Sequence, residues 1–407
     1  MDRGPVGRHP SRIEMVTKCL PLMDCLRRWQ DLPSREPHGF FAPGRANLLG
    51  AHMDYNGGAV MPVALSKGTY AVAGLRDDGI LHLESAQFPG EVLELPLSEL
   101  RPQREPGAWS AYVEGGLWTA MERWGTLPGL DLILHADLPM AKGLSSSASV
   151  ECLAVQVVAR LLGLEPDTDL MIHLAHAAET KYVGVRCGIL DQTAIFLGRA
   201  DTVLHFDCLE LTREHVPLDR REARIAIMDS GVARELASSA FNQRVSECTR
   251  ALVMLQEHLP GITCLRDVSL EDLERLERYL PPVLQNRARH VVEEFARTDF
   301  GADALRLGNV ADFGACMTKA HESLRNLFEV STPELDALVQ AATEVDGCYG
   351  GRLTGAGFGG CVAAIVHPGA ATAFEQHVIQ QYAEATGRQT EVQWFDPAGG
   401  PRELDLP

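Results

Sequence analysis

Residues 138–149 read LPMAKGLSSSAS and bring together a lysine, a glycine and three consecutive serines. The stretch before them, LDLILHADL (130–138), alternates apolar and polar residues, which predicts a β-strand. The stretch after them, SASVECLAVQVVARLLG (147–163), places apolar residues at helical spacing and ends on a glycine. This order predicts that a strand leads through a glycine- and serine-rich loop into a long amphipathic helix.

The loop has the composition of an anion-binding site. A helix N-terminus presents unpaired N–H groups and the positive end of the helix dipole, and both attract phosphate. Gly143 and Ser145–Ser147 add backbone freedom and hydroxyl groups, and Lys142 adds a cation. The alternative is that a serine only caps the helix, for which one serine suffices. We favour phosphate binding, at a site other than a P-loop, because the sequence contains no G-x-x-x-x-G-K-[ST] motif.

Composition argues against several classes of protein. The formal charge of −18 argues against nucleic-acid binding, which requires a basic surface. No run approaches the roughly 18 apolar residues that span a bilayer, and the N-terminal residues lack the apolar core of a secretory signal. The ten cysteines form no C-x-x-C pair, which is typical of reduced thiols in a cytosol. We therefore expect a cytoplasmic protein with no membrane or nucleic-acid partner.

The length of 407 residues predicts two or three domains. Residues 1–38 carry few strand signals and are interpreted as a variable segment. Short alternating runs between residues 60 and 100 predict strands, whereas helical spacing dominates from about residue 232. The charged stretch LTREHVPLDRREAR separates these patterns, so we predict one domain over 39–220 and another over 221–407.

Two groups of residues suggest metal sites, and we disfavour both. LLGAHMDYNGG places His52 and Asp54 two residues apart beside a turn-like Asn-Gly-Gly. His173, His176 and Glu179 recur at three-residue steps on a predicted helix. Three-residue steps stay on one helix face, as metal ligands would require. Histidines near a helix surface are nevertheless more often packed or solvated than bound to metal.

An aspartate follows a Cys-Gly turn in VGVRCGILDQ, where Asp191 could act as a general base or cap a helix. Arg45, in PGRANLLG, could supply the positive charge that keeps this aspartate ionised. The alternative for Arg45 is a surface ion pair of little energetic value. Spacing alone leaves these alternatives open.

GAGFGGCV (355–362) fits G-x-G-x-x-G-x-V, the pattern of dinucleotide loops and of protein-kinase glycine loops. Its context contradicts both assignments. A dinucleotide loop opens a helix, whereas the β-like run CVAAIV follows here. The Asp-Phe-Gly sequence at 312–314 precedes the glycines instead of following them, and no V-A-I-K or H-R-D motif accompanies it.

Together these segments resemble a known family. GRANLLGAHMDYNGG is similar to the galactokinase signature, and LPMAKGLSSSAS is similar to the phosphate loop of the wider GHMP kinase superfamily. GGRLTGAGFGGCV resembles the third, C-terminal glycine motif of that superfamily. Further matches follow in the family's order between about Phe40 and His367: WSAYVEG, GVRCGILDQ, DSGVARELASSAFNQRVSEC, RARHVVEE and FGACMTKAHESL.

The resemblance implies an α+β fold with two domains. The N-terminal domain would be like the second domain of ribosomal protein S5, and the C-terminal domain would be ferredoxin-like. The active site would lie between them. There, ATP and Mg²⁺ would phosphorylate the anomeric hydroxyl of a galactose-configured sugar. The expected partners are this sugar and ATP, and we expect a monomer.

The resemblance also implies roles for single residues. Asp191 matches the catalytic aspartate that accepts the C1 hydroxyl proton, and Arg45 matches the arginine that holds it. Ser147 and Glu179 match the Mg²⁺ ligands. The residues that match sugar-pocket positions are Ala51, His52, Asp54 and Phe241. The residues that match nucleotide or phosphate positions are Lys142, Gly143, Leu144, Ser145, Ser146, Ser147, Ala148, Gly355 and Gly357.

The sequence departs from the family pattern in the sugar pocket. Ala51 replaces a glutamate that is expected to accept a hydrogen bond from the C6 hydroxyl, and Phe241 replaces a tyrosine. In the phosphate loop, Ala141 and Lys142 replace Gly-Ala. Loss of a charged hydrogen bond, worth about 1.5–3 kcal/mol, would weaken galactose binding. Loss of a carboxylate would also admit a sugar with its own carboxylate at C6, as in galacturonokinases. The sequence therefore slightly favours a C6-modified sugar such as D-galacturonate over D-galactose.

Two other functions are compatible with parts of the sequence. A catalytically silent sugar sensor of the galactokinase family is disfavoured because the serine loop, Asp191, Arg45 and Glu179 are all present. A kinase for another superfamily substrate, such as mevalonate or homoserine, is disfavoured by the cluster of His52, Asp54 and Tyr55.

Overall fold

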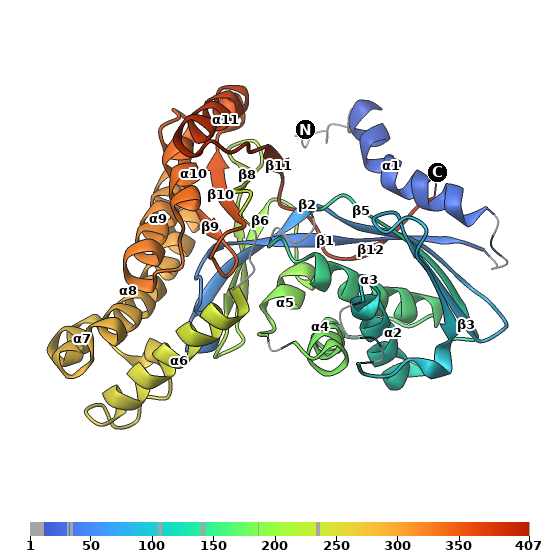
Figure 1. The fold of residues 1–407 in the computed structure, drawn as a ribbon, viewed down its shortest axis with the longest axis horizontal. Coiled ribbons are helices and arrows are strands. Elements are labelled where there is room, and N and C mark those ends of the chain that lie inside the picture. The colour runs from blue at the N-terminus through green and yellow to red at the C-terminus, as the bar shows by residue number, and fades with distance from the viewer. Residues whose placement is uncertain are drawn as a thin grey trace, which may run out of the picture.

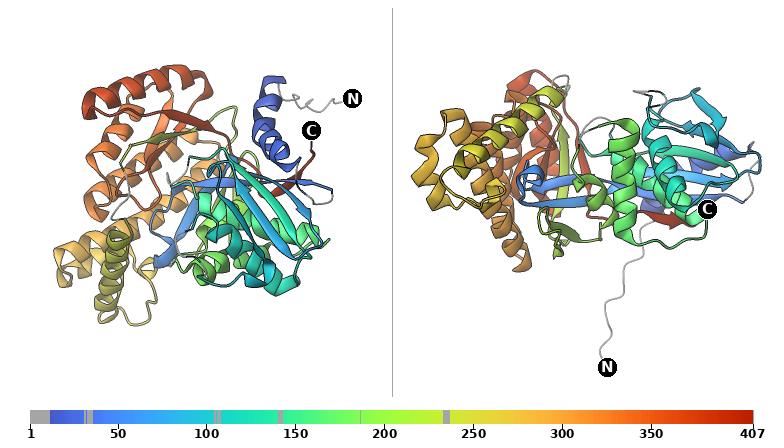
Figure 2. Two further views of the ribbon diagram at one scale, coloured as in Figure 1. Left: turned by 45° about the vertical axis from the view of Figure 1, so that its right-hand side comes forward. Right: turned by 90° about the horizontal axis from the view of Figure 1, so that it is seen from below.

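The computed structural model describes residues 12–30, 32, 36–103, 105, 108–139, 143–185, 187–232 and 237–406. The predictions for Lys142 and Ala141 lie outside these residues. Figure 1 shows two sheets, each covered by helices, with the long strands β1 and β2 extending from one towards the other. Figure 2 shows the same arrangement from two further sides.

The larger sheet has the order β12-β1-β2-β5-β3-β4, and β6 and β7 branch from β2. Strands β3 and β5 run parallel, and the other neighbouring pairs run antiparallel. The strand bounds are β1 His38–Leu49, β2 Ala59–Leu75, β3 Ile80–Ser85, β4 Val92–Pro96, β5 Leu130–Ala136, β6 Thr202–Asp207, β7 Arg213–Pro217 and β12 Arg402–Leu404.

Alternate side chains of this sheet are buried on opposite faces. On one face, Phe40, Ala71 and Leu132 pack in a core cluster with the helices α2 and α3. On the other face, Phe41 and Val72 pack with the N-terminal helix α1. Side chains along a strand point alternately to the two faces, so a helix on each face buries nearly every apolar residue of the central strands.

Helix α1 (Arg12–Trp29) lies within residues 1–38, which were interpreted as a variable segment with few strand signals. Its residues Leu22, Cys25 and Trp29 are buried against β2 and β5. Figure 1 shows α1 on the opposite side of the sheet from α2, α3 and α4. The N-terminal segment therefore completes the core of the larger sheet.

The helices on the other face start and end much as their sequences predict. Helix α3 begins at Ser146, directly after the serine-rich loop, and ends before Gly163. The next helix is capped by the Asp167 carboxylate, which accepts hydrogen bonds from the backbone N–H groups of Asp169 and Leu170. The helix bounds are α2 Ala111–Trp124, α3 Ser146–Leu161, α4 Thr168–Ala177 and α5 Leu190–Phe196.

The smaller sheet is antiparallel, with the order β11-β8-β10-β9. In chain order these strands and the intervening helices follow a β-α-β-β-α-β pattern, so the predicted ferredoxin-like domain is confirmed. The strand bounds are β8 Arg224–Asp229, β9 Cys348–Thr354, β10 Cys361–Val366 and β11 Val392–Phe395. The helix bounds are α6 Ala237–Gln256, α7 Leu270–Leu276, α8 Pro282–Arg306, α9 Val310–Ser323, α10 Pro333–Thr343 and α11 Ala371–Thr386.

The two sheets share one buried cluster. Leu48 and Met61, from the larger sheet, pack with Ile225 and Ile365, from the smaller one, and with Phe313 of α9. The C-terminal strand β12 also returns to pair with β1. The predicted boundary near residue 220 stays a prediction, but it divides two parts that are joined by apolar packing. None of the described helices is long and apolar enough to cross a membrane.

Candidate active site

An arginine and an aspartate that are far apart in the sequence form the centre of the site. Arg45 lies on β1, and Asp191 lies in the first turn of α5. The Nε and Nη2 atoms of Arg45 each donate to one Asp191 carboxylate oxygen at 2.7 Å. This two-pronged geometry is the strong form of a carboxylate–guanidinium contact. Arg45 therefore does not form the solvent-exposed ion pair that was its alternative, because its side chain is only 11% exposed.

The loop before α3 is tied to the same pair. Arg45 Nη1 donates to the Gly143 carbonyl oxygen at 2.8 Å, and its backbone N–H donates to the Leu144 carbonyl oxygen. Ser145 Oγ donates to Asp191 Oδ2 at 2.5 Å. Ser145 adopts a left-handed backbone conformation (φ 56°) and makes no capping hydrogen bond to α3. The capping alternative is therefore wrong for this serine, whose hydroxyl is directed to the aspartate.

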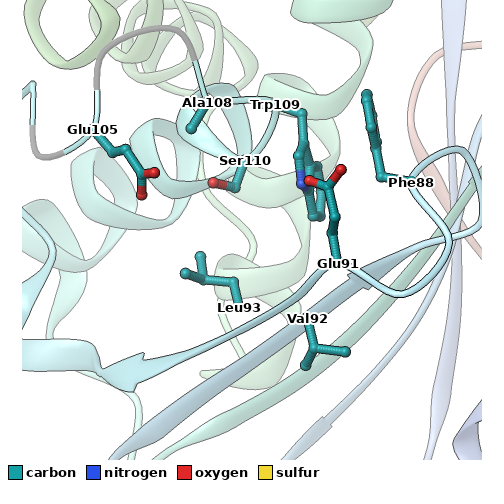
Figure 3. A pocket seen from close by; sticks show the side chains of 8 residues that line it. All are labelled: Phe88, Glu91, Val92, Leu93, Glu105, Ala108, Trp109 and Ser110. Atoms are coloured by element: carbon teal, nitrogen blue, oxygen red, sulfur yellow. The ribbon is translucent and has the colours of Figure 1, made fainter.

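The other loop residues either line a cavity or pack in the hydrophobic core. Ser146 and Ser147 line a cavity of 380 Å³ at the N-terminus of α3, together with Trp109 and Tyr112. Phe88 borders the same cavity, and its ring stacks on Trp109 with centroids 5.0 Å apart. Figure 3 shows these two rings side by side in the adjoining hollow.

Two of the predicted nucleotide residues have buried side chains. Leu144 is 1% exposed and Ala148 is fully buried, and both pack in the core. Their side chains therefore position the loop, and only their backbone atoms remain available to a phosphate.

Glu179 lies on a π-helical segment, η3 (Ala178–Val183), that continues α4. Such segments widen the helix by one residue and occur frequently at functional sites. The Gln192 side-chain amide donates to Glu179 Oε2 at 2.7 Å and to Glu151 Oε2 at 3.0 Å. Burial, followed by the negative charge of Asp191, raises the pKa of Glu179. The excess of buried carboxylates favours a cation here, and their oxygen atoms suit Mg²⁺.

The histidine metal site is not supported. His173 Nδ1 and His176 Nε2 each contact a backbone carbonyl oxygen, those of Asp169 and Cys187. Among the residues that the structure describes, no group of three or more histidine, cysteine or acidic side chains could hold a metal ion. Mg²⁺ in phosphoryl-transfer sites uses one or two carboxylates and takes its other ligands from phosphate and water, so Glu179 still fits that ion.

A second cavity, of 590 Å³, lies where the two domains meet. Both domains contribute to its wall, since Arg45 and Asp191 meet Phe241 of α6 and Gly355 of the β9–β10 turn there. Its lining residues are Arg45, Asn47, Gly50, Ala51, His52, Asp54, Gly184, Val185, Cys187, Gly188, Leu190, Asp191, Phe241, Asn242, Gly355 and Ala356. The predicted catalytic pair and all four predicted sugar residues thus share one cavity.

Burial shifts the pKa values of His52 and Asp54 in opposite directions. Burial lowers the pKa of His52 to about 3, so the ring is neutral, and its Nδ1 atom lies 3.0 Å from the Tyr55 hydroxyl. Burial raises the pKa of Asp54 to about 6, and the charge of Asp191 adds to this effect. His52 also has a positive φ of 62°, a strained backbone conformation of the kind that clusters at functional sites.

The glycine motif forms the turn between β9 and β10, and the β-like run that follows it is confirmed as strand β10. Gly355 borders the 590 Å³ cavity. Gly357 has a φ of 85°, and a Cβ atom there would lie 2.3 Å from the Val330 carbonyl oxygen. Gly357 is therefore required for close backbone packing, and its predicted role at the nucleotide stays a prediction.

Asn47, Cys187 and Asn242 also line the 590 Å³ cavity, and Gln192 joins Glu151 to Glu179, but no sequence motif assigned these residues a role. The sequence pattern could have identified Glu151 as a candidate functional residue, because it is an acidic residue on the apolar face of a predicted helix. The other four are polar residues of ordinary type whose position depends on distant contacts, so no local pattern reveals them.

Comparison with known proteins agrees with this geometry. Three family models match: the galactokinase galactose-binding signature over residues 30–75, the GHMP kinases N terminal domain over 111–199, and the GHMP kinases C terminal domain over 302–384. The mevalonate kinase fold is shared at 19% identity and a TM-score of 0.66, over 90% of this chain and 100% of the other. The fold and the site thus define a GHMP kinase.

Proteins with higher sequence identity indicate which family of GHMP kinases this is. A galactokinase of Roseiflexus sp. is 42% identical over 369 residues, which cover 90% of this chain and 93% of the relative. A galactokinase of Exiguobacterium sibiricum is 38% identical over 92% of this chain and 96% of the relative. The crystal structure of Lactococcus lactis galactokinase complexed with galactose aligns with a TM-score of 0.87 and 35% identity, over 96% of this chain and 100% of that one.

The chain belongs to the galactokinase family. It is therefore an ATP- and Mg²⁺-dependent sugar 1-kinase, as the resemblance implied.

Proposed function

We propose that this chain transfers the γ-phosphoryl group of ATP to the anomeric hydroxyl of D-galactose. The observation that carries the proposal is the Arg45–Asp191 pair, which lies in the cavity between the domains and is tied to the loop before α3. The relatives named galactokinase support this substrate better than the C6-modified sugar that the sequence slightly favoured. The predicted monomeric state and cytoplasmic location stay predictions.

We assign the role of general base to Asp191. Among the residues that the structure describes, Arg45 is the hydrogen-bond donor to its Oδ1 atom, and Arg45 Nη2 also lies 2.6 Å from this atom. The sugar C1 hydroxyl would pass its proton to this carboxylate. As that proton moves to Asp191, the sugar oxygen forms a bond to the γ-phosphorus, and the bond to the bridging oxygen breaks to release ADP. Arg45 orients the carboxylate and stabilises the charge that develops, which is the main work of such a site.

The nucleotide is placed at the N-terminus of α3. The backbone N–H groups there, with the hydroxyl groups of Ser146 and Ser147, would bind its phosphates. The cavity beside these serines offers the stacked rings of Phe88 and Trp109 as an apolar surface for the base. Glu179, with Ser147, would hold Mg²⁺, which supplies positive charge to the phosphates when bound.

Asp54 and His52 are proposed to bind sugar hydroxyl groups. A carboxylate accepts hydrogen bonds, and a neutral imidazole both donates and accepts, so the two residues together can fix the orientation of a polyol. Phe241 contributes an apolar surface, since its ring lies 5.5 Å from that of His52 and 5.6 Å from that of Tyr55.

The test is ATP turnover by the purified chain with D-galactose, N-acetylgalactosamine, L-arabinose and no sugar, followed by ADP release and by identification of the phosphorylated carbon. We expect the highest kcat/KM with D-galactose and a product phosphorylated at C1. Binding of galactose without turnover would support the silent sensor instead. Turnover only with another sugar would refute the substrate assignment while leaving the kinase assignment in place.

A further inference from the structure

A buried glutamate beside the proposed metal site has no role in the proposed mechanism. Glu151 lies on α3, one helical turn after Ser147, and is fully buried. Residues four positions apart are neighbours on a helix surface, so Glu151 and Ser147 lie on one face of α3. The Oε2 atom of Glu151 accepts a hydrogen bond from Gln192 at 3.0 Å, and its Oε1 atom has no hydrogen-bond partner among the described residues.

Gln192 connects Glu151 to Glu179. It follows Asp191 in the first turn of α5 and is fully buried. Its side-chain nitrogen donates to Oε2 of Glu151 and, at 2.7 Å, to Oε2 of Glu179. An amide nitrogen carries two hydrogen atoms, so each carboxylate can accept one of them. The three side chains therefore form one hydrogen-bonded chain that joins α3, α5 and the π-helical segment η3.

This hydrogen-bonded chain is costly to the folded protein. Burial raises the pKa of Glu151 well above its ordinary value, and the negative charge of Glu179 adds to this effect. The Oε1 atom of Gln192 is buried and, like that of Glu151, has no partner among the described residues. Buried polar atoms without partners destabilise a fold, and apolar residues of similar volume often replace buried charged groups without loss of stability. Packing alone therefore does not account for Glu151 and Gln192.

The contacts of the two residues account for the orientation of Glu179. Gln192 donates to one oxygen of the Glu179 carboxylate and so restricts the rotation of that group. Glu151 accepts the second hydrogen atom of the same amide and so restricts the rotation of Gln192. Hydrogen bonds to a ligating carboxylate orient it towards its metal ion, and their loss weakens metal binding.

We propose that Glu151 is a positioning residue for Mg²⁺ binding, because it holds the Gln192 amide, which in turn holds the Glu179 carboxylate. This inference rests on the proposed function, since it takes Glu179 as the carboxylate that binds Mg²⁺ at the nucleotide phosphates. Glu151 lines neither the 590 Å³ cavity nor the 380 Å³ cavity, so it acts through Gln192. The position of its oxygen atom, rather than its charge, is what the site requires.

The experiment compares Glu151→Gln with Glu151→Asp. Glu151→Gln removes the charge and keeps an oxygen atom at the end of a side chain of the same length. Glu151→Asp keeps the carboxylate and withdraws it from Gln192 by one methylene group. The two variants therefore separate the position of the oxygen atom from its charge.

The measured quantities are KM for D-galactose and the Mg²⁺ concentration that gives half of the maximal rate at a fixed ATP concentration. We expect Glu151→Asp to raise this Mg²⁺ concentration about tenfold, as loss of support for a metal ligand implies. Its KM for D-galactose should stay within about twofold of the wild type, because the sugar does not contact this chain of side chains. Glu151→Gln should keep both quantities within about twofold of the wild type.

Nucleotide binding without turnover gives a second measurement. ADP is titrated into each variant by calorimetry, with and without Mg²⁺ and in the absence of sugar. The tightening of ADP binding by Mg²⁺ should be weaker in Glu151→Asp than in the wild type and unchanged in Glu151→Gln. If Glu151→Asp does not fold, Gln192→Met replaces it, because an unbranched apolar side chain leaves Glu179 without this donor.

Three results would overturn the inference. An unchanged Mg²⁺ requirement in Glu151→Asp or its replacement would exclude the positioning role and leave the proposed function standing. Equal increases in Glu151→Gln and Glu151→Asp would show that the charge of Glu151 acts on the ion. Parallel increases in the Mg²⁺ requirement and in KM for D-galactose would show a general distortion of the site. Absence of sugar phosphorylation by the wild type would instead refute the proposed function, and with it the premise of the inference.

Discussion

At the scale of single residues, the carboxyl groups of the site differ because their neighbours differ. The carboxylate oxygens of Asp191 accept hydrogen bonds from two guanidinium nitrogens of Arg45 and from the hydroxyl group of Ser145. Asp54 forms no ion pair with any arginine that the structure describes, and burial raises its pKa to about 6. The same side-chain chemistry is therefore suited to two roles, a fixed proton acceptor at the reacting hydroxyl and a hydrogen-bonding group for the sugar.

Replacement of Asp191 by asparagine should lower kcat by several orders of magnitude. The amide keeps the size of the side chain but cannot accept the sugar proton. ATP should bind with an affinity within about threefold of the wild type, because the predicted nucleotide contacts lie at the N-terminus of α3. Steady-state kinetics and calorimetric titration with ATP measure the two quantities. Near-normal kcat in this variant would refute the assignment of the general base.

Replacement of Asp54 by asparagine should stabilise the chain at pH 8 and abolish tight sugar binding. The folded-state pKa of about 6 exceeds the ordinary value of 3.8. The folded protein therefore binds this proton more tightly than the unfolded chain, and the destabilising effect of ionisation is present above pH 6. It disappears as the pH falls from 6 towards 4. At pH 8 the gain is at most roughly 3 kcal/mol.

The measurement is the Tm of the wild type and of Asp54→Asn at pH 8 and pH 5, without ligands. The Tm difference should be largest at pH 8 and should shrink at pH 5. Asp346→Asn is the matched control, since Asp346 is exposed and should show no such trend. A Tm difference that is the same at both pH values would contradict the argument.

At the scale of elements, function depends on departures from regular geometry. Glu179 is directed towards Gln192 by a π-helical segment, and Ser145 contacts Asp191 from a left-handed backbone conformation. The π turn widens the helix at Glu179, where the Gln192 amide donates to its carboxylate, and the left-handed residue directs the Ser145 hydroxyl to Asp191.

Helix α1 should contribute directly to stability. Trp29 is 8% exposed and packs on the face of the sheet that contains Phe41 and Val72. Trp29→Ala should lower the free energy of unfolding by about 3–5 kcal/mol, the usual cost of truncating a buried aromatic residue. Met23→Ala, on the exposed side of the same helix, should cost much less. Urea titration measures both, and equal small losses would mean that α1 does not hold the sheet.

At the scale of the whole molecule, the active site exists only while both domains are in contact. The wall of the 590 Å³ cavity contains the proposed catalytic pair from the N-terminal domain, and Phe241 and Gly355 from the C-terminal domain. The same junction contains the apolar cluster that includes Leu48 and Ile225. Substrate binding and domain packing therefore depend on one interface.

The chain should unfold in a single transition. Separation of the domains would expose the shared apolar cluster, and it would break the pairing of β12 with β1. Differential scanning calorimetry should give a calorimetric enthalpy close to the van't Hoff enthalpy. Residues 221–407 expressed alone should not fold stably. Two resolved transitions, or an isolated C-terminal half with a cooperative transition of its own, would contradict this expectation.

The sequence by itself determined the elements and the family. Apolar spacing and Gly163 located α3, and the β-like run after Gly360 located strand β10 where a nucleotide motif had seemed to match. These features are local, because helix and strand periodicity and capping act over a few residues. The quoted motifs then indicated the family and the reaction that its members catalyse.

Only the tertiary structure decided which of these residues meet. The Arg45–Asp191 contact spans 146 positions, and the contact of Arg352 with Leu48 spans 304. The packing of α1 on the sheet was not predicted either, although Leu22, Cys25, Leu26 and Trp29 recur at helical spacing. Long-range contacts depend on the summed packing of many elements, so no local pattern encodes them. Only the folded chain therefore brings the Ser145 hydroxyl to Asp191, and Phe241 of α6 to the cavity wall that contains His52.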